Sequence, residues 1–308
     1  MRIAILGATS HIAKNLIVRF LPNRENALWL FARDPVRAES FASAHGGSAV
    51  SAAVYNAFPF NDYDVVINCV GIADPLKQRG AGIELFRVTE HYDELALAFI
   101  EAHPGTRYVN FSSGAVYGTA FGNGVGEDSA ATVPVNSIGP GDFYRIAKMN
   151  AEAKHRTFSG ASIIDIRVFS FFSRFVDPDS GYLLSEILRS IRSGAAFVTT
   201  MDDIARDYVS PDDLFDLVLR CANSCGVNDV VDAYSAAPVG KLELVDTIRR
   251  EFGLQVKYAE SRADRSPTGQ KNRYLSTNRR AERLFGFIPK SSSKDVVVQE
   301  FTALFSGR

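Results

Sequence analysis

The sequence predicts an α/β fold built on a doubly wound parallel sheet, and three observations lead to this class. Short apolar runs alternate with helical patterns through the first half of the chain, which is typical of parallel strands joined by crossover helices. A turn of small residues joins the first apolar run to the first helical pattern. The chain has 308 residues, of which 46% are hydrophobic and 22% charged, enough for one large domain or two modest ones.

The strands and helices follow from the spacing of apolar residues. Six short apolar runs are expected to be strands, at 2–6, 27–31, 48–54, 65–70, 108–111 and 163–168. Helices are expected between them at 11–20, 35–44 and 86–102. Beyond residue 169 the alternation loosens, and helices are expected at 182–192, after the capping residue Ser210, and at 241–252, 278–285 and 293–305. Ligand sites of parallel sheets lie at the carboxyl ends of strands, so the residues that follow each strand are the candidates for function.

Charge and cysteine content exclude several functions. With 34 Lys and Arg against 35 Asp and Glu, the chain has no broad basic surface for nucleic acid or an anionic membrane. No apolar run approaches the roughly 20 residues of a membrane-spanning helix. Cys69, Cys221 and Cys225 are too few for a disulfide framework or a metal site, so we expect a cytoplasmic protein without a metal. Cys221 and Cys225, four apart, are expected to pack on one face of a helix.

The turn after the first predicted strand has the composition of a dinucleotide-binding turn. Residues 7–13 read Gly-Ala-Thr-Ser-His-Ile-Ala and open the first predicted helix. A diphosphate needs a tight turn, close approach of the backbone and the N–H groups at the start of a helix. Ser and Ala stand at the two later positions where glycine is usual. The cofactor-binding residues expected here are Gly7, Thr9, Ser10, His11 and Ile12.

The end of the second predicted strand bears on the choice of cofactor. An NAD site usually has an acidic residue here for the ribose hydroxyls, whereas a basic residue suits the 2′-phosphate of NADP. In this chain Arg33 comes first and Asp34 follows one residue later. We therefore expect Arg33 to contact the cofactor and favour NADP over NAD, although Asp34 at the ribose would suit NAD.

A tyrosine and a lysine four residues apart form the candidate catalytic pair. Tyr144 and Lys148 lie on one face of a predicted helix. A nearby ammonium stabilises a phenolate and is expected to lower the tyrosine pKa toward the working pH. Residues 112–118, Ser-Ser-Gly-Ala-Val-Tyr-Gly, follow the fifth predicted strand and offer a serine for the same substrate oxygen. Together these groups predict the interconversion of an alcohol and a carbonyl.

These motifs resemble those of the extended short-chain dehydrogenase/reductases, in the nucleotide-sugar epimerase/dehydratase family. The resemblance covers nearly the whole chain and also includes residues 206–213, Arg-Asp-Tyr-Val-Ser-Pro-Asp-Asp. It implies an NAD(P)-binding Rossmann domain over residues 1–168, with a return segment near 207–236. It implies a smaller substrate-binding α/β subdomain over residues 169–206 and 237–308. The expected partners are a nucleotide-sugar and a second copy in a homodimer.

The resemblance also implies roles for individual residues. The family pattern selects Ser113 as the catalytic serine, because it lies four residues before the tyrosine of Val-Tyr-Gly, and leaves Ser112 a structural neighbour. Ser113, Tyr144 and Lys148 are then catalytic, with Tyr144 and Lys148 also touching the cofactor. Gly71 is expected to let the backbone approach the adenosine side. The expected substrate-binding residues are Ser113, Ser170 in place of the usual asparagine, Arg206 on the diphosphate and Arg265.

Three family reactions and one non-enzymatic role compete. A 4,6-dehydratase has Asp-Glu directly after the catalytic residue, and Gly114 and Ala115 stand there, which argues against dehydration. A 4-epimerase retains NAD, whereas a 4-ketoreductase uses NADPH once and releases it. Arg33 favours the reductase slightly. A non-enzymatic dinucleotide sensor typically lacks the Tyr–Lys pair that this chain has.

Overall fold

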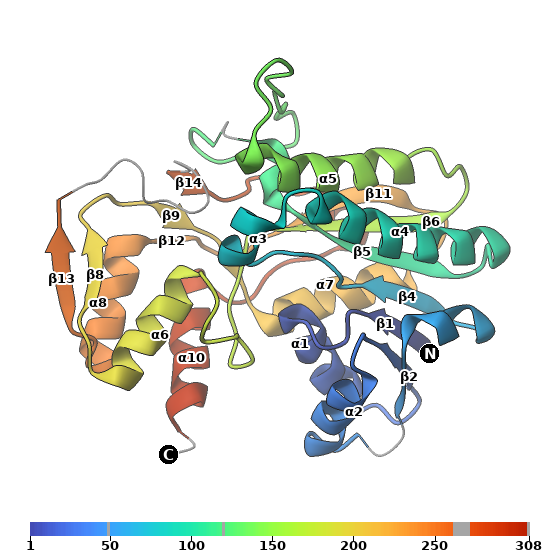
Figure 1. Cartoon of the computed structure of the whole chain (residues 1–308), viewed down its shortest axis with the longest axis horizontal. Helices are drawn as coiled ribbons and strands as arrows, with labels where there is room; N and C mark the ends of the chain where they lie inside the picture. The colour runs from blue at the N-terminus through green and yellow to red at the C-terminus, as the bar shows by residue number, and fades with distance from the viewer. Residues whose placement is uncertain (48–49, 119–120, 261–271, 307–308) are drawn as a thin grey trace.

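A seven-stranded parallel sheet forms the centre of the larger lobe (Figure 1). The computed structural model describes residues 1–47, 50–118, 121–260 and 272–306. The strand order is β11-β6-β5-β4-β1-β2-β3, so β2 and β3 lie on one side of β1 and the later strands lie on its other side. This order confirms the expected doubly wound α/β fold. The strands are β1 (Arg2–Leu6), β2 (Ala27–Phe31), β3 (Val50–Ala53), β4 (Val65–Asn68), β5 (Arg107–Ser113), β6 (Ser162–Val168) and β11 (Asn228–Ala233).

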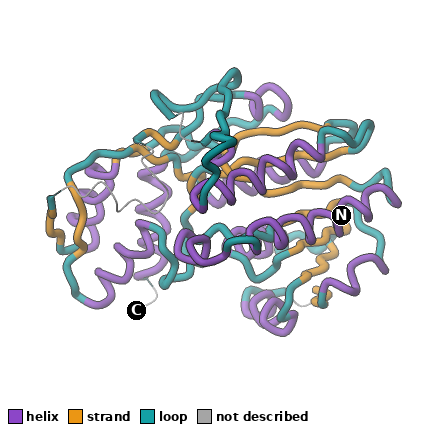
Figure 2. Tube along the Cα trace, turned by 45° about the horizontal axis from the view of Figure 1, so that its top comes forward, coloured by secondary structure: helices purple, strands orange, loops and turns teal. Residues whose placement is uncertain are grey.

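Helices cover both faces of this sheet, because its strands are apolar on both sides. Along β1, Ile3 and Ile5 pack into one core with Leu16, whereas Ala4 belongs to the opposite core with Leu97. Figure 1 shows α4 and α5 on one face and α1, α2 and α7 on the other, and Figure 2 shows the same layering from a second angle. The helices are α1 (His11–Phe20), α2 (Pro35–Ala44), α4 (Glu84–Ala102), α5 (Pro140–His155) and α7 (Pro211–Asn223).

A smaller lobe packs beside the carboxyl edge of the sheet. Its core contains Phe172, Leu184, Leu244 and Phe301, which come from four separate segments. Its helices are α6 (Leu183–Ser193), α8 (Lys241–Phe252) and α10 (Ser293–Phe305). Its short strands are β7 (Ser170–Phe171), β8 (Phe197–Thr200), β9 (Ala205–Arg206), β10 (Tyr208–Val209), β12 (Val239–Gly240), β13 (Val256–Ala259) and β14 (Arg273–Tyr274). After the smaller lobe begins, the chain contributes one more strand to the large sheet, since β11 pairs in parallel with β6.

Most predicted elements match the structure within two residues, and the differences have local causes. Helix 278–285 begins only at Arg280, as α9 (Arg280–Phe285), because the Asn278 side chain accepts the Arg280 N–H outside the helix. The expectation for the two cysteines is wrong: α7 ends at Asn223, so Cys221 is buried and Cys225 is exposed.

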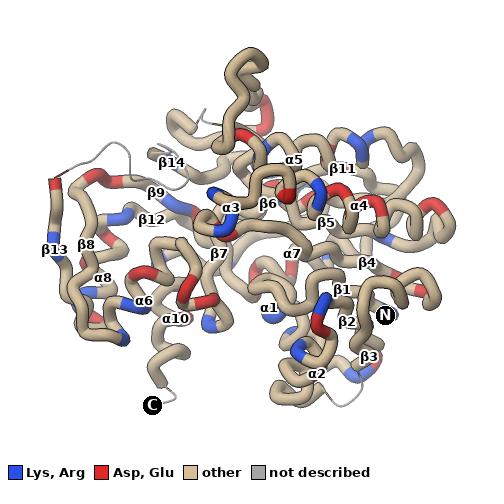
Figure 3. Tube along the Cα trace, in the orientation of Figure 1, with Lys and Arg blue, Asp and Glu red and all other residues tan. Residues whose placement is uncertain are grey.

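Lys and Arg residues and Asp and Glu residues are scattered along the chain in both lobes (Figure 3). Among the described ranges, no helix has both the length and the apolar character needed to cross a bilayer. Three short helical segments remain: η1 (Tyr55–Phe60), α3 (Pro75–Ala81) and η2 (Gly114–Tyr117).

Candidate functional site

The turn after β1 requires glycine at its first position. Gly7 has a φ of +76°, and a Cβ there would come within 3.0 Å of the backbone of Cys69 and Val70. The N–H groups of Gly7 and Ala8 both donate to the Phe31 carbonyl, at 2.9 and 3.0 Å. The turn is therefore held against the carboxyl ends of β2 and β4, at the point where the strand order reverses.

The first turn of α1 leaves N–H groups available for an anion. Ser10 is the N-cap, and its Oγ accepts the Ala13 N–H at 3.4 Å. Within the described part of the chain, the N–H groups of His11 and Ile12 have no hydrogen-bond partner. Thr9 lies in the same turn. These residues fit the diphosphate of a dinucleotide, because unpaired N–H groups and the helix dipole both favour an anion.

The end of β2 presents cations rather than a free carboxylate. The Asp34 side chain caps α2 by accepting the Arg37 N–H at 3.1 Å. Arg33 and Arg37 are both exposed at this edge. Burial and the nearby Arg37 charge lower the pKa of Lys14, so these two cations lie close together. This arrangement suits a phosphate group better than a ribose hydroxyl.

An aromatic pair beside the glycine turn was not anticipated from the sequence. The Tyr55 hydroxyl lies beside the Gly7 backbone, and its ring centroid is 4.3 Å from that of Tyr92. Burial raises the pKa of Tyr55 to about 12. The two rings come from η1 and α4, 37 positions apart, so no local pattern links them.

Ser113, Tyr144 and Lys148 come together at the carboxyl end of β5. Tyr144 and Lys148 are one turn apart on α5, and the buried Lys148 Nζ donates to the Phe111 carbonyl at 2.8 Å. The Ser113 hydroxyl is close enough to Tyr144 to affect its ionisation. A Cβ at Gly71 would lie 3.5 Å from Lys148 Nζ, so Gly71 lies beside the candidate catalytic lysine.

The ionisation of Tyr144 differs from the sequence-based expectation. Burial raises the pKa of Tyr144, and only the interaction with the Ser113 hydroxyl opposes the rise. Burial lowers the pKa of Lys148, while the negative charges of Asp93 and Asp165 oppose that change. The net shift of the Tyr144 pKa is therefore upward, opposite to the expected lowering toward the working pH. At neutral pH the phenol carries its proton.

Ser112 and Ser113 have different surroundings because neighbouring strand residues point to opposite faces. The Ser112 Oγ donates to Glu152 at 2.5 Å, and the same carboxylate is paired with Arg167. The Ser113 Oγ instead accepts the Ala115 N–H at 3.1 Å and lies 3.4 Å from the Tyr274 hydroxyl. Only Ser113 is at the edge that holds Tyr144.

Position 114 has no room for a side chain. A Cβ on Gly114 would lie 2.6 Å from the ring of Phe169. An aspartate there would have to displace a buried aromatic side chain. Ser170, the residue after Phe169, lies in β7 and pairs with Tyr208 of β10.

The smaller lobe brings Arg206 and Tyr274 toward the same edge. They are register partners in the parallel pair of β9 and β14, and the guanidinium lies 5.8 Å from the Tyr274 ring centroid. Arg206 Nη1 donates to the Ala205 carbonyl at 2.9 Å, and burial lowers the Arg206 pKa. The neighbouring Asp207 instead accepts the Ser235 N–H at 2.8 Å. Arg265 lies outside the described residues.

Two further tyrosines at this edge were missed by the sequence reasoning. The negative charge of an ionised Tyr144 raises the pKa of both Tyr182 and Tyr274, although burial is the largest cause in each case. Tyr274 is 130 positions from Tyr144 and sits in a two-residue strand, which carries no recognisable sequence signal.

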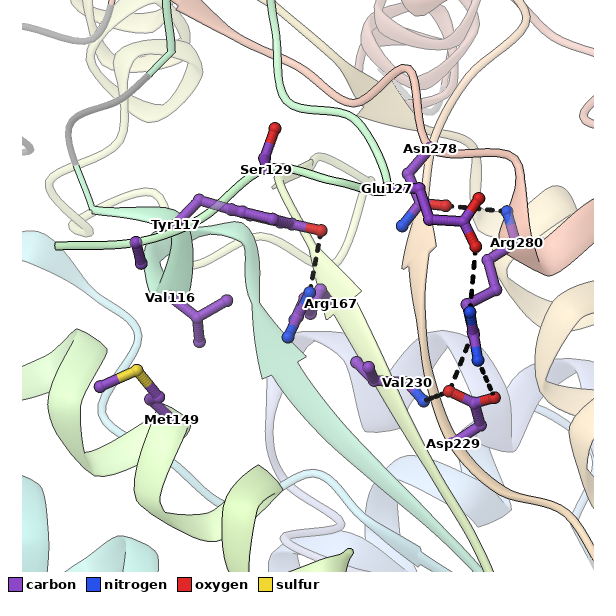
Figure 4. A pocket seen from close by; sticks show the side chains of 11 residues that line it. Val116, Tyr117, Glu127, Ser129, Met149, Arg167, Asp229, Val230, Asn278 and Arg280 are labelled. Atoms are coloured by element: carbon purple, nitrogen blue, oxygen red, sulfur yellow. Dashed lines mark hydrogen bonds and ion pairs between the residues drawn. The ribbon is translucent and has the colours of Figure 1, made fainter.

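A cavity of about 360 Å³ opens elsewhere, between β6, β11 and α9 (Figure 4). Figure 4 shows Arg167 beside the Tyr117 hydroxyl, at 2.8 Å, and Arg280 between Glu127 and Asp229. Both guanidinium groups are already paired with carboxylates. The cavity lacks Ser113 and the Tyr144–Lys148 pair, so we assign the chemistry to the strand edge instead.

Comparison with known proteins gives a family and a fold. The family model described as the NAD-dependent epimerase/dehydratase family matches residues 3–237. No curated protein matches the chain by sequence.

Solved structures resemble the chain over almost its full length. The UDP-glucuronic acid 4-epimerase from Bacillus cereus, solved with UDP-glucuronic acid and NAD, is 15% identical with a TM-score of 0.82, covering 100% of both chains. The UDP-glucose 4-epimerase from Bifidobacterium longum, with NAD+ and UDP, is 16% identical with a TM-score of 0.80, covering 100% of this chain and 99% of the other. The dTDP-glucose 4,6-dehydratase from Bacillus anthracis, with NAD, is 16% identical with a TM-score of 0.78, covering 100% and 97%.

Proposed function

Because the chain belongs to the NAD-dependent epimerase/dehydratase family, we propose that it is an oxidoreductase that acts on a nucleotide-activated sugar at C4. The observation that carries this proposal is the meeting of Ser113, Tyr144 and Lys148 at the sheet edge that also holds the Gly7 turn. We favour a 4-ketoreductase that uses NADPH. Residues 1–168 with 207–236 would hold the dinucleotide, and residues 169–206 with 237–308 would hold the nucleotide-sugar.

The preference for NADP rests on the end of β2. The Asp34 carboxylate caps α2 through Oδ1, so one of its two oxygens is engaged with the backbone of that helix. Arg33, Arg37 and Lys14 supply positive charge at the same place. Arginine binds phosphate through a planar, bidentate fork, which matches a 2′-phosphate.

The proposed mechanism assigns the proton to Tyr144. The bound dinucleotide supplies the hydride for the sugar carbonyl carbon. The Tyr144 phenol donates its proton to the carbonyl oxygen, and the Ser113 hydroxyl donates a hydrogen bond to the same oxygen. The Lys148 ammonium, held by the Phe111 carbonyl, stabilises the phenolate that remains. Arg206 binds the diphosphate, with Ser170 and Arg265 as further substrate contacts.

The ionisation of Tyr144 is compatible with its proposed role as a proton donor. Burial raises the pKa of Tyr144, so the phenol carries its proton at neutral pH. The choice between reductase and epimerase therefore rests on the end of β2 and not on Tyr144. The crowding at Gly114 argues against a dehydratase, because the acid–base pair of that reaction has no space there.

A 4-epimerase with retained NAD is the second candidate. Two of the similar structures described above are 4-epimerases that were solved with NAD, one with UDP-glucuronic acid and one with UDP. A non-enzymatic dinucleotide sensor is third, because the chain keeps the Tyr144–Lys148 pair that a sensor does not need.

One experiment separates the three candidates. The dinucleotide that copurifies is extracted and identified, its exchange is followed by dialysis, and hydride transfer is measured with UDP- and dTDP-4-ketohexoses. Exchangeable NADP with consumption of NADPH supports the reductase. NAD that survives dialysis, with interconversion of 4-epimers, supports the epimerase. Dinucleotide binding without hydride transfer supports the sensor.

The role of Arg33 is tested by its alanine variant. Arg33→Ala should lower the affinity for NADPH by roughly ten- to a hundredfold, since a charge-assisted contact is worth about 1.5–3 kcal/mol. Its affinity for NADH should be almost unchanged. The control is Arg24→Ala, an exposed arginine in the turn before β2. Equal losses for both cofactors would remove the argument for NADP.

Assembly and location complete the proposal. We expect a homodimer, which light scattering on the purified protein would test against a monomer. All three cysteines are free thiols, which is the state that a reducing, cytoplasmic compartment maintains.

A further inference from the structure

A buried carboxylate near the candidate site accepts hydrogen bonds from two separate segments of the chain. Asp232 lies near the carboxyl end of β11, the edge strand of the large sheet, and its side chain is fully buried. Its Oδ2 accepts the Ser276 hydroxyl at 2.6 Å and the Tyr117 hydroxyl at 3.0 Å. A buried carboxylate destabilises the fold unless donors surround it, so these two contacts are needed where they are.

The Tyr117 hydroxyl is oriented by a guanidinium group. Arg167 Nη1 donates to the Tyr117 oxygen at 2.8 Å (Figure 4), and a guanidinium has no acceptor atom. The single proton of the tyrosine is therefore donated to Asp232. Burial raises the pKa of Tyr117 to about 12, so the phenol keeps this proton at neutral pH.

The Ser276 hydroxyl is oriented in a similar way. Its oxygen accepts the Asn278 N–H at 3.0 Å, and its proton has two acceptors within reach, Asp232 at 2.6 Å and the Val125 carbonyl at 3.5 Å. The shorter contact, to a carboxylate, is the stronger one. Burial raises the pKa of Asp232, and the hydrogen bond from Ser276 and the positive charge of Arg167 oppose this rise.

Both donor segments lead back to Ser113. Tyr117 is the last residue of η2, the helical turn that donates a backbone N–H to the Ser113 Oγ at 3.1 Å. Ser276 comes two residues after Tyr274, whose hydroxyl is 3.4 Å from the same Oγ. The path from Asp232 through η2 and the path through β14 therefore close a ring around the candidate catalytic serine.

We propose that Asp232 is a positioning residue that holds Ser113 and strand β14 of the smaller lobe in a fixed relation to one another. Arg206 is held with them, because its strand β9 pairs with β14. The inference rests on the proposed function, in which Ser113 binds the sugar oxygen and Arg206 binds the diphosphate. Asp232 acts through Tyr117 on the catalytic side and through Ser276 on the substrate side.

The positioning is tested first without any substrate, by hydrogen exchange of backbone amides. Asp232→Asn keeps the shape of the side chain but leaves one acceptor oxygen and no charge for the two hydroxyls. Exchange in residues 114–118 and 272–278 should become about tenfold faster, because local opening loses less hydrogen bonding. Asp229→Asn is the matched control: Asp229 lies on the same strand but pairs with Arg280, so exchange in these segments should equal that of the parent.

The two hydroxyls are then removed one at a time, and steady-state kinetics with the best nucleotide-sugar measure kcat and KM. Ser276→Ala releases β14 from Asp232 and should raise KM by about three- to tenfold, with kcat within about twofold of the parent. Tyr117→Phe releases η2 beside Ser113 and should lower kcat by about three- to tenfold, with KM nearly unchanged. Asp232→Asn should change both constants.

The neighbouring hydroxyl of Thr277 provides the control for these variants. It is exposed and donates to the Val125 carbonyl instead of to Asp232, so Thr277→Ala should leave both constants near those of the parent. If Ser276→Ala and Tyr117→Phe change the same constant to the same extent, or if Thr277→Ala has as large an effect, the positioning role of Asp232 is overturned.

The outcomes separate this inference from the proposed function. If the parent turns over no nucleotide-sugar, the proposed function fails, and the exchange experiment still decides whether Asp232 holds the two segments. If the parent is active and Asp232→Asn exchanges like the parent in both segments, only the role of Asp232 is overturned.

Discussion

The carboxyl edge of the large sheet and the smaller lobe differ in how they hold the residues of the candidate site. At the sheet edge, Ser113 and Lys148 are 8% and 4% exposed, and they are held by a seven-residue strand and a sixteen-residue helix. The lobe presents Arg206 and Tyr274 from strands of two residues each. The groups proposed to move a proton are thus fixed by long elements, and those proposed to grip the substrate are carried by short ones. Precise geometry matters most where bonds change.

The largest expected effect tests the sheet edge. Tyr144→Phe should lower kcat by about 10²–10⁴, because it removes the group that transfers the proton. Dinucleotide affinity measured by calorimetry should remain near that of the parent. Tyr258→Phe is the control, since it removes an exposed phenol in β13 that lies outside the candidate site. Near-normal kcat in Tyr144→Phe would break the assignment of chemistry to this edge.

The two serines sharpen the same test. Ser113→Ala should reduce kcat less than Tyr144→Phe, since it removes a hydrogen bond and not the proton donor. Ser112→Ala should reduce it least, because its hydroxyl is bound to Glu152 away from the edge. A larger loss at Ser112 than at Ser113 would show that the wrong serine is assigned.

The next largest effect concerns the buried ion pairs of a histidine on α5, the helix that carries Tyr144. The buried His155 donates to Asp93 at 2.7 Å and to Asp165 at 2.9 Å, which raises its pKa to about 9 despite the opposing effect of burial. The folded-state pKa lies above the unfolded value of 6.5. This stabilisation is therefore complete below pH 6.5 and is lost as the pH rises through about 9, by roughly 3 kcal/mol.

Urea unfolding on either side of that range measures the effect. The parent should lose stability between pH 6.5 and about 9, and His155→Gln should show a flatter profile from a lower starting stability. His91→Gln, at an exposed position on α4, should lose stability with pH in the same way as the parent protein. A parent whose unfolding free energy is constant over this range would mean that His155 is neutral.

The proposed role of the smaller lobe in binding the substrate is tested next, and the expected effect is smaller. Arg206→Ala should lower the affinity for UDP and dTDP by roughly ten- to a hundredfold and leave the affinity for the dinucleotide unchanged. Arg206→Lys should recover only part of the loss, because an ammonium lacks the bidentate fork. Arg250→Ala, an exposed arginine on α8, controls for charge alone. A fall in kcat instead of in affinity would place Arg206 with the catalytic groups.

The smallest expected effect concerns Tyr274. Its hydroxyl is 3.4 Å from the Ser113 Oγ, a long contact, so Tyr274→Phe should raise KM by a few-fold at most and leave kcat within about twofold. Steady-state kinetics with the best nucleotide-sugar would measure both constants. A loss of kcat as large as that of Tyr144→Phe would erase the distinction between the two regions.

Features that depend only on residues close together in the sequence could be predicted. The Tyr144–Lys148 pair needs only helical spacing, and the caps of α7 and α10 need only a serine three residues before an N–H. The bounds of α8 and α10 were predicted to the residue. Tyr55 was not found as a site residue, because its place beside Gly7 depends on η1 folding back over the end of β1.

The sequence by itself determined the α/β class, the dinucleotide-type turn and the spacing of Tyr144 and Lys148, because apolar periodicity and helix geometry act over a few residues. The family pattern had already selected Ser113 over Ser112. Tertiary structure alone decided that Tyr274 joins Ser113 and that the pKa of Tyr144 is raised. Desolvation and contacts between segments more than 100 residues apart arise only when the chain packs. The ionisation state of the candidate acid is therefore a property of the folded protein.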